Sequence, residues 1–305
     1  MSGTRPARPP VFLLAPARSY STVAVAMLAG HPQLFAFPEL LLFPVRPLRD
    51  LLAEELAQTG NRRIWAITQV NGILRAVAQL HDGSQDDDAI RAARGWVVAH
   101  GDRTTQELGD HLLDLVAPAI GVEKSPDTVG SDQAIAHCVQ AYPHARFLHL
   151  TRHPVTSQRS MRNYWVDQVE GETAGSLVAT SANAWYWGHR RIIRTLESLP
   201  ARQWMRVRAE DLLREPEQWL TAILDWLDLD SSAEIIARMC RTELWEFAGS
   251  GSPRRLGGGD RTFLAEPRLR EIASPPPDIA FESELGIPRP VEHAMRELAQ
   301  QLGYG

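Results

Sequence analysis

Val11-Phe12-Leu13-Leu14-Ala15-Pro16-Ala17-Arg18-Ser19-Tyr20-Ser21-Thr22 is the segment that indicates the fold class most clearly. Its first five residues form a continuous apolar run, which is typical of a buried parallel strand. Pro16 ends this run, and Ser21 or Thr22 is expected to cap a helix over the next apolar run, residues 23–29. The segment therefore predicts a strand, a tight loop and a helix in immediate succession.

The same alternation returns in the second half of the chain. Further strands are predicted at residues 119–122, 146–150 and 204–207, and helices at 132–140, from 154 onward, 173–199, 216–227, 232–241 and 291–302. Residues 46–116 show helical periodicity throughout. We therefore expect an α/β fold of the P-loop-like, three-layer kind, with a central parallel sheet. One domain, residues 1–305, is expected, in which residues 46–116 form an inserted helical lobe over the substrate site.

Composition argues against several classes of protein. The 305 residues carry a formal net charge of −5, which argues against binding nucleic acid through bulk charge. No segment has the roughly 18–20 consecutive apolar residues of a membrane helix. The only cysteines, Cys138 and Cys240, are too few for a disulfide framework, so we expect a cytoplasmic protein. The acidic stretch Asp86-Asp87-Asp88 is interpreted as a solvated helix N-cap, and no metal site is expected.

The loops that follow the predicted strands are the candidate sites, because ligands of open parallel sheets bind beyond the carboxyl ends of the strands. Residues 17–22 combine the N–H groups of a helix N-terminus with hydroxyls and one guanidinium, which together suit a phosphate. The alternative is an ordinary strand–helix turn with capping hydroxyls. The segment lacks the G-x-x-x-x-G-K-[ST] pattern, which disfavours an ATP- or GTP-binding P-loop.

Two other strand ends carry basic residues. Arg152 leaves the end of one predicted strand and Ser160 lies about two helical turns further on, so both could contact one additional phosphate. An exposed basic loop is the alternative. Lys124, the single lysine among 32 basic residues, follows another strand, where it could neutralise charge on a transferring group. A surface ion pair with Glu123 is the alternative there.

Taken in order, these loops resemble the superfamily of sulfotransferases that use 3′-phosphoadenosine-5′-phosphosulfate (PAPS), and the resemblance covers most of the chain. Residues 16–22 are similar to the 5′-phosphosulfate loop P-x-[RK]-S-[GS]-[ST]-[ST], and Arg152 with Ser160 resembles the pair that grips the 3′-phosphate. Three further segments resemble family motifs: Glu123-Lys124-Ser125-Pro126, Arg208-Ala209-Glu210-Asp211-Leu212 and Gly259-Asp260-Arg261-Thr262-Phe263. Ala29-Gly30-His31-Pro32 followed by Phe37-Pro38-Glu39-Leu40 is similar to bacterial small-molecule and tyrosylprotein-type members.

The resemblance implies roles for the matched residues. Glu39 would be the catalytic base, while Arg18 and Lys124 would hold oxygens of the transferring group. The implied PAPS-binding residues are Arg18, Ser19, Tyr20, Ser21, Thr22, Arg152, Ser160, Gly259 and Asp260. Glu123 is the reserve base, and His31 and His100 are lesser candidates. Without the resemblance, Glu39 would be read as a helix cap or a surface carboxylate.

Three positions depart from the family pattern. Tyr20 stands where glycine or serine is usual, Leu41 where many bacterial members have histidine, and Ala209 where tyrosine is common. The expected function is transfer of a sulfuryl group to a hydroxyl or amine of a small-molecule acceptor, for instance a natural product, or of a carrier-bound one. A sulfotransferase fold with altered or lost chemistry and a nucleotide kinase or NTPase are the alternatives. The oligomeric state is left open, with a homo-oligomer among the alternatives.

Overall fold

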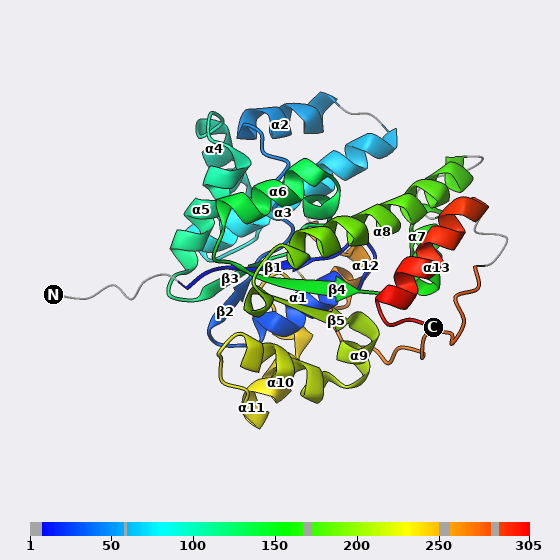
Figure 1. Ribbon diagram of the computed structural model, residues 1–305. Coiled ribbons are helices and arrows are strands. Elements are labelled where there is room, and N and C mark those ends of the chain that lie inside the picture. The colour runs from blue at the N-terminus through cyan, green and yellow to red at the C-terminus, as the bar shows by residue number, and fades with distance from the viewer. Residues whose placement is uncertain (1–7, 58–59, 167–172, 250–256, 282–286) are drawn as a thin grey trace.

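A five-stranded parallel sheet forms the centre of the protein (Figure 1). The computed structural model describes residues 8–57, 60–166, 173–249, 257–281 and 287–305. The strand order is β2-β3-β1-β4-β5. The strands are β1 (Val11–Leu14), β2 (Leu34–Ala36), β3 (Ile120–Glu123), β4 (Arg146–Thr151) and β5 (Trp204–Arg208). The four strands predicted from the sequence are therefore confirmed, and one strand, β2, was not predicted.

The missed strand β2 lies at the edge of the sheet and has only three residues. It pairs with β3 in parallel, with Leu34 opposite Ile120 and Ala36 opposite Val122. Three residues are too few to show a strand periodicity in the sequence. Its position matters for function, because Phe37-Pro38-Glu39 leave the sheet directly after it.

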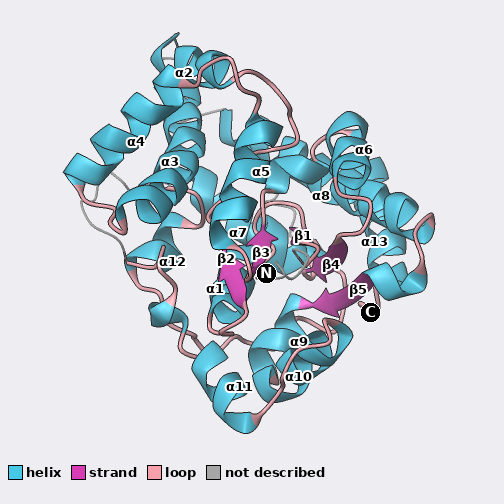
Figure 2. Ribbon diagram, turned by 90° about the vertical axis from the view of Figure 1, so that its left-hand side faces the viewer, coloured by secondary structure: helices cyan, strands magenta, loops and turns pink. Residues whose placement is uncertain are grey.

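Helices cover both faces of the sheet, which makes the fold three-layered α/β as expected (Figures 1 and 2). One face carries α1 (Ser21–Ala29) together with α9 (Ala209–Arg214), α10 (Pro216–Trp226) and α11 (Ala233–Met239). The other face carries α5 (Thr105–Val116), α6 (Asp132–Ala141) and α8 (Thr173–Glu197). The helices α7 (Pro154–Val166) and α13 (Arg289–Gln301) pack beside α8 at one end of the sheet, and α12 (Arg261–Ala265) is a short helix near the strand ends.

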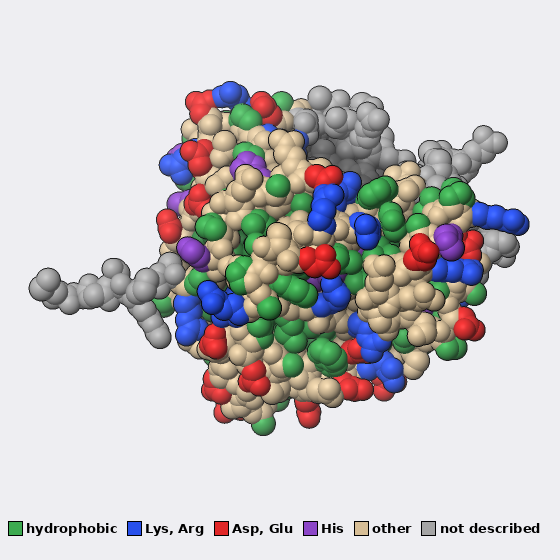
Figure 3. Space-filling model, viewed as in Figure 1, with side chains coloured by type: hydrophobic (Ala, Val, Ile, Leu, Met, Phe, Trp, Pro, Cys, Tyr) green, Lys and Arg blue, Asp and Glu red, His purple; other side chains and the backbone are tan. Residues whose placement is uncertain are grey.

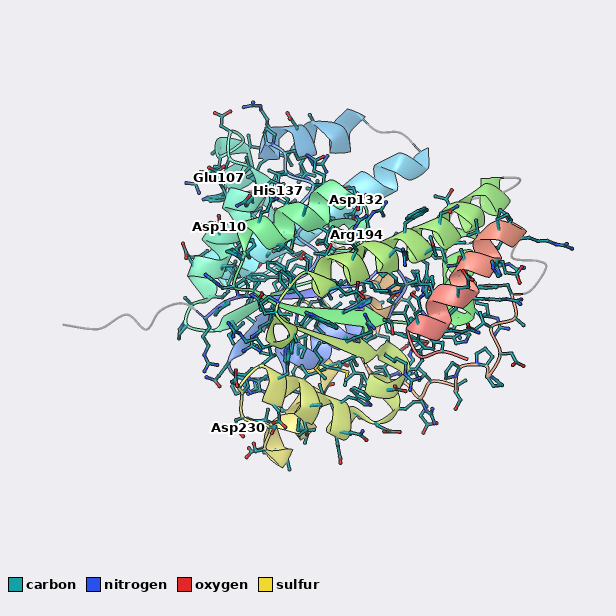
Figure 4. All side chains as sticks on the ribbon, in the orientation of Figure 1. Glu107, Asp110, Asp132, His137, Arg194 and Asp230 are labelled. Carbon is teal, nitrogen blue, oxygen red and sulfur yellow. The ribbon has the colours of Figure 1, made fainter. Side chains whose placement is uncertain are left out.

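The described part of residues 46–116 is mostly helical, as the sequence predicted, and forms α2 (Leu48–Ala57), α3 (Gly60–Asp82), α4 (Asp87–Ala99) and α5. The acidic stretch begins α4, with Asp86 as the helix cap, because its carboxylate accepts hydrogen bonds from the N–H groups of Asp88 and Ala89. A capping box of Thr104 and Glu107 begins α5, and Glu107 is labelled in Figure 4. Within the described residues no cluster of potential metal ligands occurs, and no helix has the length and apolarity to cross a membrane.

Arg75 of α3 joins this helical region to a distant part of the chain. Its guanidinium is buried and donates hydrogen bonds to the Gln85 side chain and to the carbonyl oxygens of Phe247 and Gly257. Burial lowers the pKa of Arg75 to about 10, so the group stays charged at neutral pH. The arginine therefore supplies hydrogen-bond donors to two buried carbonyl groups.

Arg75→Met is expected to lower the free energy of unfolding by about 3 kcal/mol, because it leaves two buried carbonyl groups without a donor. Chemical denaturation of the purified variant measures this change. Arg91→Met is the matched control, since Arg91 is exposed and its hydrogen bonds among the described residues go to the Asp88 side chain and to the Asp87 carbonyl oxygen of its own helix. Equal losses for the two variants would contradict the structural role of Arg75.

Candidate active site

A cavity of about 440 Å³ lies where β1, β3 and β4 end, as expected for an open parallel sheet. Its wall brings together the loop after β1, Glu39 after β2, the turn after β3 and the segment after β4. Arg152 and Ser160, separated by the first two turns of α7, both line it. Residues of α8 and the start of α12 complete the wall: Thr180, Ser181, Ala184, Arg191, Gly259, Asp260 and Arg261. Loops far apart in the sequence therefore meet around one space.

The loop after β1 has an unusual backbone. Arg18 and Tyr20 both adopt left-handed conformations, with φ of 63° and 58°. Tyr20 is the N-cap of α1 and makes no side-chain cap, so the expectation that Ser21 or Thr22 caps the helix is wrong. The helix instead begins at Ser21, directly after the turn at Tyr20. The Thr22 hydroxyl accepts hydrogen bonds from the Lys124 ammonium and the Asp260 N–H. The first N–H groups of α1 lack helical partners and are available for an anion at the cavity.

Arg152 reaches back to this loop from the end of β4. Its Nη1 donates to the Arg18 carbonyl oxygen at 2.8 Å, its Nη2 to the Tyr20 hydroxyl at 3.0 Å and its Nε to Thr156 Oγ1 at 3.2 Å. Ser160 Oγ accepts a hydrogen bond from Arg18 Nε at 3.1 Å. The structure thus brings Arg152, Ser160 and Arg18 together, although 134 residues separate the two arginines.

The turn that holds Arg152 is fixed by residues outside the cavity. The Glu210 carboxylate accepts hydrogen bonds from the His153 N–H at 2.8 Å and from the Tyr304 hydroxyl at 3.0 Å. Trp185 Nε1 donates to the Arg152 carbonyl oxygen at 3.2 Å. Burial lowers the pKa of His153 to about 4, so this ring adds no positive charge beside Arg152. Glu210 of the Arg208–Leu212 motif therefore holds the Arg152 turn from outside the cavity. Ala209 of the same motif is buried.

Glu39 and Lys124 form an ion pair at the centre of the site. The Lys124 ammonium also donates to Thr22 Oγ1 at 3.2 Å. The Glu39 side chain is 19% exposed and lines the cavity, whereas that of Lys124 is only 3% exposed. The ammonium therefore connects an accessible carboxylate with the loop after β1.

Two further carboxyl groups lie near Glu39. Glu123 is buried, and its carboxylate is held by the Leu40 N–H at 3.2 Å and by the Ser125 hydroxyl. Burial raises the pKa of Glu123 to about 7. Asp127, which the sequence analysis left without a role, lines the cavity, and burial together with the nearby Glu39 raises its pKa to about 6. Asp127 lies in the turn after a predicted strand, and this position in the sequence could have identified it as a residue of the site.

Leu41, one of the three departures from the family pattern, is also near this carboxylate cluster. It is buried, adopts a left-handed conformation with φ of 54° and donates its N–H to Ser125 Oγ at 2.9 Å. The side chain lines a neighbouring pocket rather than the main cavity. Leu41 therefore contributes to the site through its backbone.

Asp260 joins the site from the C-terminal part of the chain. Its carboxylate pairs with Arg18 at 2.6 Å and caps α12, and its N–H donates to Thr22 Oγ1 at 3.0 Å. The adjacent Gly259 lies so close to Thr22 that a Cβ there would come within 2.9 Å of Thr22 Cγ2. Glycine thus permits this close approach of the two loops, since any larger residue would displace Thr22.

The two candidate histidines do not line the cavity. His31 follows α1, where its ring contacts the Gln33 N–H and the Asp230 carbonyl oxygen. Figure 4 labels Asp230 at the bottom of the molecule, below the sheet. His100 is the C-cap residue of α4, and its ring contacts the Trp96 carbonyl oxygen. Both rings are therefore held by contacts at helix ends.

A parallel α/β fold in which a helix N-terminus, arginines and carboxylates line one cavity at the strand ends is typical of P-loop-like proteins. The model of the Sulfotransferase family matches residues 9–233, and the chain belongs to this family. A search of curated protein sequences found no match.

Solved structures agree with this assignment of the fold. The sulfotransferase domain from the curacin biosynthetic pathway has a TM-score of 0.73 and 20% identity, and the match covers 98% of this chain and 99% of that chain. The sulfotransferase domain of the olefin synthase from Synechococcus PCC 7002 has a TM-score of 0.72 and 22% identity, covering 100% and 98%. Mouse sulfotransferase SULT7A1 complexed with PAP is more distant, at 0.50 and 11%, covering 96% and 89%.

Proposed function

We propose that the protein transfers a sulfuryl group from PAPS to a hydroxyl or amine of a small-molecule or carrier-bound acceptor, with Glu39 as the base. The observation that carries this proposal is the position of Lys124. Its ammonium contacts both the Glu39 carboxylate and the Thr22 hydroxyl of the loop after β1. One cation thereby links the group that would take the acceptor's proton to the loop that would hold the donor.

The donor part of the site suits a nucleotide with phosphates at two positions. The N-terminus of α1 would bind the 5′-phosphate, while Arg152 and Ser160 would bind the 3′-phosphate. Ser19 Oγ in the same loop is buried and has no hydrogen-bond partner among the described residues, which fits a loop built to close around a ligand. Four arginines and three acidic residues line the cavity: Arg18, Arg152, Arg191, Arg261, Glu39, Asp127 and Asp260.

PAPS would supply the sulfuryl group, whose sulfur bonds to the acceptor oxygen as the bond from sulfur to the 5′-phosphate breaks. Glu39 would take the proton that the acceptor hydroxyl loses. Lys124 would keep Glu39 in place and stabilise the negative charge that develops on the departing bisphosphate. Arg18 would act from the other side of the loop, where it is steadied by Asp260 and Ser160. The protein's main contribution would be positioning and charge stabilisation.

Position favours Glu39 over Glu123 as the base. Glu39 lines the cavity, whereas the buried Glu123 carboxylate is held by the Leu40 N–H and the Ser125 hydroxyl. A base must come within hydrogen-bond reach of the proton that it removes. Glu123 is better suited to keeping the Leu40–Leu41 backbone and the Lys124 turn in register.

The acceptor would enter between α8 and the turn after β3. The cavity wall there includes small and apolar groups: Pro126, Val129, Gly130, Thr180 and Ala184. Two similar structures are sulfotransferase domains from the curacin biosynthetic pathway and from an olefin synthase. A small-molecule or carrier-bound biosynthetic acceptor would fit this part of the wall. Basic and acidic side chains are interspersed over the face seen in Figure 3, which suits a compact acceptor better than a long polyanion.

Adenosine 3′,5′-bisphosphate is expected to raise the melting temperature of the protein clearly more than AMP at the same concentration. Binding to the folded state stabilises it in proportion to affinity, and only the bisphosphate supplies the group that Arg152 and Ser160 would hold. Thermal shift in parallel ligand titrations measures the difference. Equal shifts with both nucleotides would remove the PAPS assignment, and a larger shift with ATP would favour a kinase.

A further inference from the structure

Tyr20 is placed where the family pattern has a glycine or serine, and its conformation is costly. Its φ of 58° lies in the left-handed region, which glycine adopts freely and tyrosine does not. Strained residues of this kind persist where the surrounding structure fixes them, and they concentrate at functional sites. The contacts of the tyrosine ring show what is gained at this position.

The ring of Tyr20 lies against the guanidinium of Arg152. The Arg152 Cζ is 3.8 Å from the ring centroid, the shortest cation–ring distance among the described residues. The Tyr20 hydroxyl also accepts a hydrogen bond from Nη2 of the same guanidinium at 3.0 Å. One side chain therefore fixes both the tilt and the rotation of the arginine's plane.

These contacts still leave Arg152 able to bind an anion. An arginine has five N–H groups, and its contacts with Thr156, Arg18 and Tyr20 use three of them. The side chains of Arg152 and Tyr20 both line the cavity, with Ser160 beside them. A planar cation that is already oriented loses less freedom when it binds a phosphate.

We infer that Tyr20 is a positioning residue that orients Arg152 for the 3′-phosphate and thereby sets the selectivity for a 3′-phosphorylated nucleotide. This inference rests on the proposed function, since it concerns the donor half of the same site. It also accounts for the departure from the family pattern. Tyrosine loses the backbone freedom of glycine at this position, but its ring and hydroxyl hold the Arg152 guanidinium. The 5′-phosphate is left to the backbone N–H groups of residues 20–22, which do not involve the tyrosine ring.

The test compares Tyr20→Phe and Tyr20→Gly with the unaltered protein by calorimetric titration with adenosine 3′,5′-bisphosphate and with AMP. Tyr20→Phe removes the hydroxyl and keeps the ring, and it should lower the preference for the bisphosphate about tenfold, or about 1.4 kcal/mol. Tyr20→Gly removes the ring as well and should lower the preference further. Glycine accepts the positive φ without strain, so this second variant should fold.

The ratio of the two affinities is the decisive readout, because a merely structural role would weaken both nucleotides alike. AMP binding should therefore stay within about twofold of the unaltered protein in both variants. Tyr142→Phe is the matched control: it also removes a tyrosine hydroxyl bond, to Asp110, at a residue that does not line the cavity.

Two outcomes would overturn the proposals, and they differ from one another. If the unaltered protein binds both nucleotides equally, the proposed donor is wrong. If it prefers the bisphosphate and both Tyr20 variants keep that preference unchanged, or lose both nucleotides equally, the donor stands and the role of Tyr20 is wrong.

Discussion

Glu39→Gln is expected to lower the rate of sulfuryl transfer by about 10²–10⁴-fold, the contribution typical of a positioned general base. Glutamine has the same size and can still accept a hydrogen bond from Lys124, but it cannot take a proton from the acceptor. The affinity for adenosine 3′,5′-bisphosphate should stay close to that of the unaltered protein, because Glu39 is assigned to the acceptor side of the site. The rate is measured as bisphosphate released from PAPS, with an acceptor that the unaltered protein turns over.

Glu123→Gln is the control for this experiment. Glutamine can still accept the hydrogen bonds from Leu40 and Ser125 through its carbonyl oxygen, so the turn after β3 should be retained. The variant should keep most of the activity. The reverse pattern, with Glu39→Gln active and Glu123→Gln inactive, would move the base to Glu123.

Lys124→Met is expected to lower the rate of transfer by about 10²–10³-fold, which is the loss found when one charge-stabilising donor is removed. Methionine keeps the length and apolar stem of lysine but lacks the ammonium that contacts Glu39 and Thr22. Single-turnover kinetics separate the chemical step from binding, and the effect should fall on the chemical step.

Lys124→Arg should restore part of this rate, because arginine keeps the positive charge in a bulkier group. The melting temperature of each variant shows whether it is folded. A folded Lys124→Met protein whose rate of sulfuryl transfer is within a few-fold of the normal rate would contradict this role. The ammonium would then serve only as the ion-pair partner of Glu39.

The sequence predicted the elements whose signals are local. The apolar run at Val11–Ala15 and the proline after it were sufficient for β1 and its loop, and the alternation of apolar runs placed β3, β4 and β5. Strand β2 was missed because three residues carry no periodicity. The cap of α1 was assigned to the wrong residue because no local pattern marks a tyrosine in the left-handed conformation, and the side chain of this tyrosine contacts Arg152, 132 residues further along.

The candidate site was predictable to the same extent. Motif positions named Arg18, Glu39, Lys124, Arg152 and Asp260. The structure places four of them in the wall of one cavity, and the buried Lys124 contacts Glu39 and Thr22 of that wall. The parts of the site that depend on long-range packing leave no signal in the sequence. Tyr304 contacts Glu210 from the last turn of the chain, and Thr180 and Arg191 reach the cavity from α8. No local pattern marks these side chains, because their neighbours in space are distant in sequence.

The structure of the protein with adenosine 3′,5′-bisphosphate bound is the most direct measurement of the proposed donor site. The proposal predicts the 5′-phosphate against the N–H groups of residues 20–22, next to Thr22 and Lys124. It predicts the 3′-phosphate on Arg152 and Ser160, with the Tyr20 ring still stacked on the arginine. A nucleotide bound in the opposite orientation, or outside this cavity, would contradict the assignment of the strand-end loops as a PAPS site.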